Sequence, residues 1–343
     1  MTGAPWYWIT IAPSARVRQL KGSSASGSSC STTGTIPPRG TIDTVKIGVQ
    51  LPEVERVVRW PELREMAVTA EAIGLDSIWV GDHLLYRNDG LPSRGPWEAW
   101  STLAALATVT ERVEFGPLVA STSFHNPAML AKKAAAIDEI SDGRLILGLG
   151  AGWNEVEYAA YGFPFDHRVS RFEEAFTIIR LLLSTGRCDF HGTYYQLDDA
   201  ELLPRGPRPD GPPLMIGSIG ERMLRVALPY VSSWNAWSAW FGNSLEGYLP
   251  MRDRVDAACV EVGRDPTEVE RTLALLVAFS GAVGRGSAVS EAPFEPIDGA
   301  AASLVPTLRG FAAAGVGHVQ LVLDPITVES IAALEPTLSV LAG

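Results

Sequence analysis

The chain has 343 residues, of which 46% are hydrophobic, and it carries a formal net charge of −11 at pH 7. This apolar content suits a globular protein with a sizeable core, and the length suits one large α/β barrel or two ordinary domains. A strongly acidic chain is a poor partner for nucleic acid or an anionic membrane, so we expect neither. No apolar run approaches the roughly 18 residues of a membrane-spanning helix. The three cysteines lie far apart, which excludes a disulfide framework or a cysteine zinc site and favours a cytoplasmic location.

Residues 1–44 differ in composition from the rest of the chain. Residues 22–34 form a tract of Ser, Gly and Thr, which is the composition of a flexible linker, and Asp43 is the first acidic residue. We interpret residues 1–44 as a disordered or non-native extension that is dispensable; a transit peptide is the less favoured alternative. The sequence therefore predicts a single domain over residues 45–343.

From Lys46 onward, short apolar runs alternate with segments of helical periodicity. The predicted strands are 46–51, 76–81, 113–120, 145–149, 214–217, 233–236, 271–278 and 318–323. The predicted helices are 61–73, 97–109, 127–142, 169–184, 221–230, 245–262, 300–314 and 327–341. Residues 186–213 read as an insertion that would suit a hairpin, and residues 281–299 read as a loop. Eight strand–helix units predict a (β/α)8 TIM barrel with insertion segments rather than a doubly wound open sheet.

The residues that follow each strand are the candidates for function, because barrel active sites lie at the carboxyl ends of the strands. A Schiff-base enzyme would need a lysine there, but the lysines lie only at positions 21, 46, 132 and 133. The five histidines are scattered, so we expect no metal site. Asp82 follows strand two without an evident acidic partner for glycoside hydrolysis. We therefore expect no nucleophile and no acid–base pair, and a bound cofactor that carries the chemistry.

Three strand ends carry residue types that suit a ligand. Asp82 and His83 follow strand two, where they could bind a heterocycle or move a proton; the alternative is a loop cap and a packed core histidine. Strand four continues as Gly148-Leu-Gly150-Ala-Gly152, followed by Asn154, Tyr158 and Tyr161 on one helical face. Ordinary packing of a tight turn explains this stretch equally well. It is a weak match to a dinucleotide fingerprint, because Trp153 occupies the third glycine position.

Strand five ends in Gly217-Ser218-Ile219-Gly220, directly before a predicted helix. Backbone N–H groups at such a position can bind an anion, although a glycine-rich turn without a ligand is about as common. Arg222 and Arg225 could add positive charge. The run therefore predicts a phosphate contact.

The run from Gly148 to Tyr158, G-L-G-A-G-W-N-E-V-E-Y, resembles the luciferase-like monooxygenase superfamily, as does Gly81-Asp82-His83. The resemblance covers roughly residues 45–341. It implies a (β/α)8 barrel that binds FMN or the deazaflavin coenzyme F(420), with the ring beside the strand-four run and the phosphate at the strand-five run. Ser218 and Ile219 depart from the more glycine-rich family pattern. The resemblance also implies a bulged end of strand three, with a non-proline cis peptide near Pro117-Leu118.

On this basis, Asp82 and His83 are the candidate catalytic residues. The candidate cofactor-binding residues are Pro117, Leu118, Ala120, Gly150, Gly152, Asn154, Tyr158, Gly217, Ser218, Ile219 and Gly220. We expect hydride transfer through F(420) on a small-molecule substrate. The alternatives are a monooxygenase that uses reduced FMN, a non-catalytic flavin-binding protein, and a phosphate-binding barrel with unrelated chemistry. The predicted helix 97–109 is apolar nearly all round, which favours a homodimer.

Overall fold

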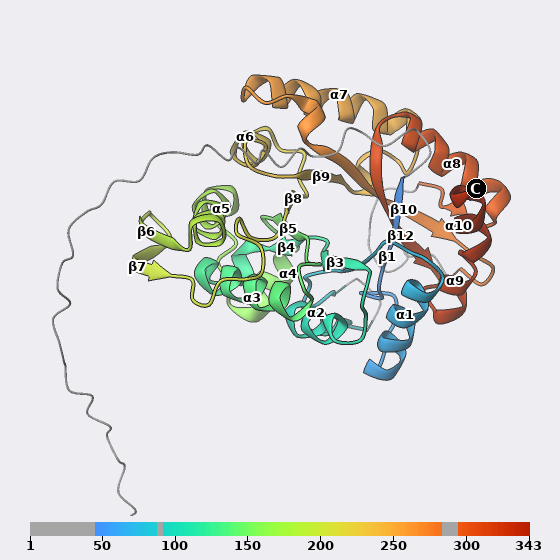
Figure 1. The fold of residues 1–343 in the computed structure, drawn as a ribbon, viewed down its shortest axis with the longest axis horizontal. Coiled ribbons are helices and arrows are strands. Elements are labelled where there is room, and N and C mark those ends of the chain that lie inside the picture. Colours follow the sequence, from blue (N-terminus) through green and yellow to red (C-terminus); the bar gives the residue numbers. More distant parts are fainter. Residues whose placement is uncertain (1–44, 88–91, 283–293) are drawn as a thin grey trace, which may run out of the picture. The chain divides into compact units, whose positions relative to one another are not determined.

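In a computed structural model, residues 45–87, 92–282 and 294–343 are described; the predicted extension 1–44 lies outside them. The principal sheet contains β1 (Lys46–Gln50), β2 (Ser77–Val80), β3 (Glu114–Pro117), β4 (Ala120–Ser121), β5 (Leu147–Gly150), β8 (Leu214–Ile216), β9 (Ser233–Ala236), β10 (Glu270–Ala278), β11 (Ile297–Asp298) and β12 (Val316–Asp324). The helices are α1 (Trp60–Ala72), α2 (Ala99–Ala107), α3 (Pro127–Ile140), α4 (Glu155–Tyr161), α5 (Arg168–Thr185), α6 (Glu221–Ala227), α7 (Leu245–Glu261), α8 (Ala301–Ala313), α9 (Val328–Ala332) and α10 (Glu335–Ala342). Short 3-10 turns are η1 (Thr122–Phe124), η2 (Ser238–Trp240) and η3 (Pro266–Glu268). Figure 1 shows the helices outside the strands.

The strands pair in parallel in the order β3-β2-β1-β12-β10-β9-β8-β5-β4, and the short β11 pairs in parallel with β10 outside this order. β3 and β4 stand at the two ends of this order and are consecutive parts of one predicted strand. The sheet therefore closes on itself between them. A parallel bridge between Phe115, in β3, and Leu145, just before β5, also joins these neighbouring parts of the barrel. The predicted (β/α)8 barrel is therefore confirmed. Its strands form a nearly closed ring of eight when β3 and β4 are counted as one strand.

The break between β3 and β4 falls at Leu118 and Val119, whose peptide bond is cis. The prediction of a non-proline cis bond between residues 116 and 121 is therefore confirmed. Its placement at Pro117-Leu118 is wrong by one residue. The prediction of one continuous strand over 113–120 is also wrong, because the chain leaves the ladder at this bond.

Several other boundaries differ from the predictions for local reasons. The predicted helix 169–184 is preceded by a separate short helix, α4, which ends at Gly162 in the left-handed conformation. The predicted helix 327–341 is wrong as a single element: it is split into α9 and α10, and Pro336 in the first turn of α10 has no N–H with which to continue a helix. The insertion forms an antiparallel hairpin of β6 (Arg187–His191) and β7 (Gln196–Glu201), as its composition suggested.

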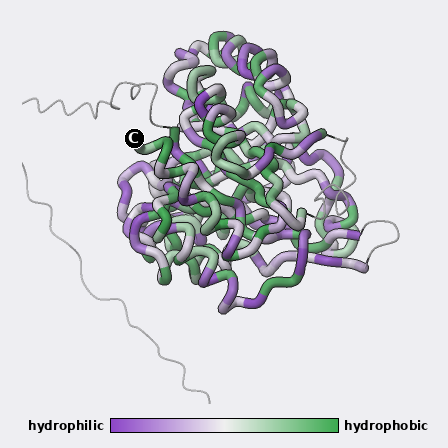
Figure 2. Tube along the Cα trace, turned by 90° about the vertical axis from the view of Figure 1, so that its right-hand side faces the viewer, coloured by the Kyte–Doolittle hydropathy of each residue, from purple (hydrophilic) through white to green (hydrophobic). Residues whose placement is uncertain are grey.

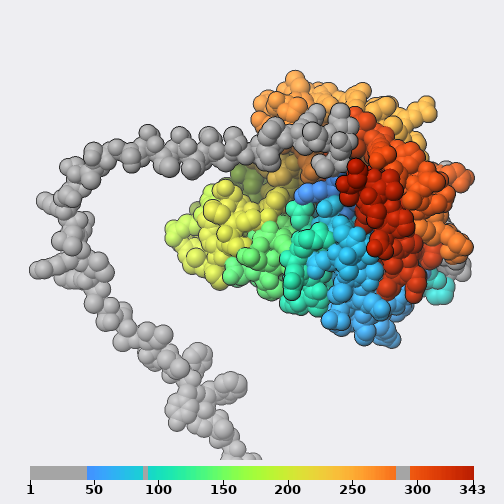
Figure 3. All heavy atoms as spheres, turned by 45° about the vertical axis from the view of Figure 1, so that its right-hand side comes forward, coloured from blue at the N-terminus to red at the C-terminus, as the bar shows by residue number. Residues whose placement is uncertain are grey.

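The hydrophobic core occupies the barrel interior and the layer between the strands and the helices. Figure 2 shows the hydrophobic residues concentrated along the inner segments of the trace. The first and last parts of the barrel lie side by side, since β1 pairs with β12 and α1 contacts α9, as the blue and red surfaces of Figure 3 show. No helix in the described part of the chain combines the length and apolar character needed to cross a bilayer.

Two neutral polar groups, Asn235 and His318, are buried inside the barrel. Asn235 Nδ2 donates to Thr272 Oγ1 and Gln320 Oε1, both at 2.8 Å. His318 lies near the start of β12, where its Nε2 is 2.6 Å from Ser77 Oγ. Burial, with a smaller contribution from the charge of Lys46, lowers the pKa of His318 to about 3. His318 is thus an uncharged part of the core on the side of the barrel opposite to the carboxyl ends of the strands.

Candidate active site

A cavity of about 640 Å³ opens at the carboxyl ends of the strands. Residues at or after the carboxyl ends of six barrel strands, β1, β2, β4, β5, β8 and β9, form its wall. This is the end at which barrel enzymes bind their ligands, and the volume is in the usual range for a small-molecule or cofactor site. The structure therefore leaves room for a ring system where the sequence predicted one.

Most of the residues that the sequence singled out lie in the wall of this cavity. They are Asp82, His83, Leu118, Gly150, Gly152, Gly217, Ser218, Ile219 and Gly220. The other four, Pro117, Ala120, Asn154 and Tyr158, are buried behind the wall. The tertiary structure thus brings together the ends of β2, β4, β5 and β8, as expected.

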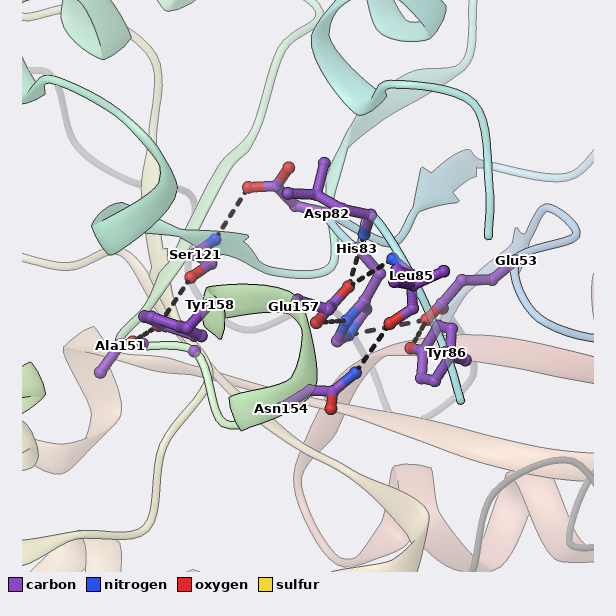
Figure 4. A network of polar contacts seen from close by, with 12 residues as sticks. Glu53, Asp82, His83, Leu85, Tyr86, Ser121, Ala151, Asn154, Glu157 and Tyr158 are labelled. Carbon is purple, nitrogen blue, oxygen red and sulfur yellow. Dashed lines mark hydrogen bonds and ion pairs between the residues drawn. The ribbon is translucent and has the colours of Figure 1, made fainter. Parts of the chain in front are cut away.

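His83 is held between two carboxylates at this end of the barrel, as Figure 4 shows. Its Nδ1 lies 2.9 Å from Glu157 Oε2, and its Nε2 lies 3.6 Å from Glu53 Oε1. Glu157 is fully buried and also accepts a hydrogen bond from the backbone N–H of Leu85 at 3.0 Å. Glu53 accepts hydrogen bonds from Tyr86 Oη and from Gln50 Nε2. The expectation that no acid–base pair exists at the strand ends is therefore wrong.

These contacts fix the protonation state of the imidazole. Because the Glu157 carboxylate can only accept, His83 Nδ1 carries a proton and donates it to Glu157 Oε2. Nε2 is then the nitrogen that gains or loses a proton. Burial opposes the charged form, but the carboxylates of Glu53, Glu157 and Asp82 outweigh burial and raise the pKa of His83. The raised pKa favours the protonated imidazole, which can donate a proton from Nε2.

Asp82 faces the end of strand three rather than His83. Its Oδ2 accepts a hydrogen bond from Ser121 N at 2.9 Å and lies 2.9 Å from His125 Nε2. The carboxylate therefore ties the end of β2 to the chain that follows the cis peptide bond. In this position Asp82 orients the cavity wall, and it also contributes negative charge near the imidazole.

Tyr158 and Asn154 act behind the wall. Tyr158 Oη donates to the Ala151 carbonyl at 2.7 Å and accepts from Ser121 Oγ at 3.2 Å, which joins β4 to the glycine-rich turn. Asn154 Nδ2 donates to the Leu85 carbonyl at 3.1 Å. Tyr161, which was expected on the same helical face, is 55% exposed and lies outside the wall.

The glycines of the wall are required by their surroundings. A Cβ on Gly150 would lie 2.8 Å from Val119 Cγ2, and one on Gly217 would lie 2.9 Å from the same atom. Gly152 adopts φ +75°, and a Cβ there would lie 2.1 Å from Tyr158 Oη. These glycines therefore leave the room that Val119 and Tyr158 occupy, and a larger side chain at any of the three would collide with them.

Arg168 is the cation that sequence reasoning missed in this wall. Its Nη1 donates to the Gly152 carbonyl at 2.7 Å, and its guanidinium lies 4.1 Å from the centre of the Phe165 ring. Arg168 begins α5, which packs against α6, the helix that follows the run from Gly217 to Gly220 after β8. Arg222, by contrast, pairs with Glu173 on the exterior.

The acidic residues beside His83 also escaped the sequence analysis. Glu53 follows β1 by three residues, so inspection of every strand end could have found it. Glu157 lies on the helix after β5, within the run that suggested the family, and only its burial identifies its role. Trp237 and Trp240 follow β9 and line the cavity, although nothing in their spacing indicates a site.

The comparisons with known proteins agree with this architecture. The family model described as luciferase-like monooxygenase matches residues 40–291. An F(420)-dependent glucose-6-phosphate dehydrogenase of Amycolatopsis mediterranei is 40% identical over 154 residues, which are 43% of this chain and 45% of that protein. The enzyme of the same name from Kineococcus radiotolerans is 31% identical over 230 residues, 64% of each chain.

These alignments cover about half to two thirds of the length of the two relatives. A solved structure, an F(420)-dependent secondary alcohol dehydrogenase in complex with an F(420)-acetone adduct, superposes with a TM-score of 0.71 at 20% identity. It covers 87% of this chain and 99% of that one, and supports the barrel fold. With a family model matched over most of its length, this chain belongs to the luciferase-like monooxygenase family.

Proposed function

We propose that this protein is an oxidoreductase that transfers a hydride between the deazaflavin F(420) and a small-molecule substrate. The observation that carries the proposal is the placement of His83, with Nδ1 held by Glu157, in the wall of a glycine-lined cavity at the barrel mouth. The named relatives that share part of this sequence are F(420)-dependent, which favours the deazaflavin over FMN.

The residues of the cavity fit such a cofactor. Leu118, Gly150 and Gly152 would border the ring, and Ser218 with Gly220 would meet the phosphate, whose charge Arg168 would balance. Gln50 Oε1 is buried and has no hydrogen-bond partner among the described residues, so it offers one acceptor to a bound ligand. When bound, the deazaflavin supplies or accepts a hydride.

The chain itself supplies the proton chemistry. His83 Nε2 takes the hydroxyl proton when an alcohol is oxidised and returns it to the carbonyl oxygen in the reverse direction. Glu157 holds the ring in one tautomer, and Glu53 stabilises the protonated imidazole.

The experiment that tests the proposal is a titration of the protein with F(420) and with FMN, each followed by cofactor fluorescence. We expect saturable binding of F(420) and weaker binding of FMN. Gly150→Val should abolish the binding of F(420), because the added atoms collide with Val119. Gly310→Ala on α8 is the matched control, since a Cβ there meets only Leu245 Cδ2 at 3.5 Å.

The titration also separates the alternatives. Tighter binding of FMN, together with oxygen consumption by the reduced complex, would favour the monooxygenase alternative. Binding without oxidation or reduction by any acceptor would favour a non-catalytic flavin-binding protein. If neither cofactor binds, the proposal is wrong and a barrel with unrelated chemistry is favoured.

The remaining parts of the proposal concern the state of the protein. We propose a cytoplasmic homodimer, supported by free, buried Cys188 and Cys259 and by the apolar sequence around α2. Trp100, Leu103 and Leu106 of α2 are already buried by the chain itself, so a partner would meet mainly the small residues on its outer side. Sedimentation measurements on the purified protein test this assembly.

A further inference from the structure

We infer that the substrate beside His83 is an uncharged alcohol or carbonyl compound with an apolar, ring-sized body, rather than a phosphorylated or otherwise anionic one. The inference rests on the proposed function, because it concerns the part of the same cavity that the cofactor leaves to the substrate. Two features of the wall carry it: its charge and its aromatic rings.

The charge of the cavity wall is unfavourable for an anion. Its described charged residues are Glu53, Asp82, His83, Glu157 and Arg168. Glu53 and Glu157 thus flank the imidazole on two sides, and Asp82 adds a third carboxylate to the same wall. The guanidinium of Arg168 is bound to the Gly152 carbonyl on the side of α5. Among the described residues, a dianion beside His83 would meet the carboxylates of Glu53 and Glu157 and no ammonium group.

Lysine does not compensate for this charge. The whole sequence has four lysines, and those in the described residues are Lys46, Lys132 and Lys133. Lys46 opens β1 at the far end of the barrel, where it pairs with Glu114. The other two belong to α3, outside the cavity wall. The described part of the chain therefore gives a substrate phosphate no ammonium contact.

Aromatic rings form the sides of the reacting end. The His83 ring centre is 4.9 Å from that of Tyr86 and 5.7 Å from that of Trp153. Trp237, Trp240 and Phe124 line the same cavity. Trp153 also lines the cavity and is 54% exposed, so its ring is accessible to a ligand.

The reaction on such a substrate balances. In oxidation, the carbinol C–H bond breaks with its electron pair going to the deazaflavin, the oxidant. The O–H proton goes to His83 Nε2, and the carbon–oxygen double bond forms. Reduction of the carbonyl compound is the same step in reverse, with the protonated imidazole as the proton donor. No further reactant is required.

The experiment compares three ligands that share one ring: benzyl alcohol, benzyl phosphate and benzylammonium. Binding to the F(420)-loaded protein is measured by saturation-transfer NMR and calorimetry, without turnover. We expect benzyl alcohol to bind at least tenfold more tightly than benzyl phosphate. Equal or tighter binding of benzyl phosphate would overturn the inference, as would tighter binding of benzylammonium or no binding of benzyl alcohol.

Two variants test the role of the rings. Trp240→Ala should weaken benzyl alcohol about tenfold, the effect of losing one aromatic contact. Trp60→Ala is the matched control, because both tryptophans are 38% exposed and Trp60 opens α1 outside the cavity. Trp240→Arg should improve benzyl phosphate about tenfold. If Trp240→Ala has no larger effect than Trp60→Ala, the aromatic wall does not bind the substrate.

The order of measurements separates this inference from the proposed function. Failure of F(420) to bind the unaltered protein contradicts the proposed function itself. Normal F(420) binding combined with a preference for benzyl phosphate contradicts only the substrate class.

Discussion

His83 and Glu157 are separated by 74 positions in the sequence, yet His83 Nδ1 lies 2.9 Å from Glu157 Oε2. The contact exists because β2 and β5 end on the same rim of the barrel, from which α4 carries Glu157 back towards the imidazole. The hydrogen bond to Glu157 gives the His83 imidazole one defined tautomer. The first two predictions concern this pair.

Glu157→Gln should lower the pKa of His83, because it removes a hydrogen-bonded carboxylate that favours the imidazolium. NMR titration of the imidazole in the cofactor-free protein measures this directly. Glu155→Gln is the control, since Glu155 is an exposed carboxylate on the same helix. An unchanged titration in Glu157→Gln would show that Glu157 does not control the protonation of His83.

The pair also has a consequence for stability. Because the folded-state pKa of His83 is raised, its contribution is fully present below the unfolded-state pKa of about 6.5 and is lost as the pH rises through the folded-state pKa.

His83→Asn should reduce turnover by a factor of about 10² to 10⁴, the usual contribution of a positioned proton donor or acceptor. F(420) affinity should change little, since the asparagine fits the space and the glycine wall is unaltered. Steady-state kinetics and the fluorescence titration together measure both effects. Equal loss of cofactor binding and turnover would indicate a binding role instead.

His318→Gln should make stability less sensitive to acid. The pKa of His318 is lowered to about 3, so the folded protein excludes a proton that the unfolded chain binds below pH 6.5. Stability from this group is therefore present above 6.5 and lost as the pH falls, by about 2 kcal/mol between pH 7 and 5. Urea unfolding of both proteins at the two pH values tests this. Parallel losses would contradict the assignment of a neutral, buried His318.

Arg208→Met should destabilise the fold by about 3 kcal/mol, because Arg208 pairs with the fully buried Asp138 and also donates to the Leu145 carbonyl. Arg187→Met in the same insertion is the control. Arg187 pairs with Glu201 on the surface, where an ion pair contributes about 0 to 1 kcal/mol. Denaturant unfolding compares the two, and equal effects would show that Asp138 tolerates the loss of its partner.

A chain that starts at Val45 should express as soluble protein and bind F(420) with unchanged affinity. The first strand begins at Lys46, so the barrel closes without the preceding residues. Expression and the fluorescence titration provide the measurement. Aggregation of the shortened chain, or loss of binding, would show that residues 1–44 belong to the functional protein.

The sequence alone determined the barrel, because alternation of buried strands with amphipathic helices is a local property of the chain. It also located the glycine runs and His83, since each follows a strand directly. The predicted boundaries were wrong where one apolar run forms two elements. This happens at the cis bond after Leu118, between β3 and β4, and at the break between α9 and α10.

The tertiary structure decided the chemistry of the site. Glu53 and Glu157 are ordinary acidic residues in the sequence, and only closure of the barrel brings them to opposite sides of His83. Whether a carboxylate is solvated or buried beside an imidazole depends on contacts between distant segments, which periodicity and spacing do not encode. The same holds for Arg168, Trp237 and Trp240, whose place in the cavity wall follows from the curvature of the sheet.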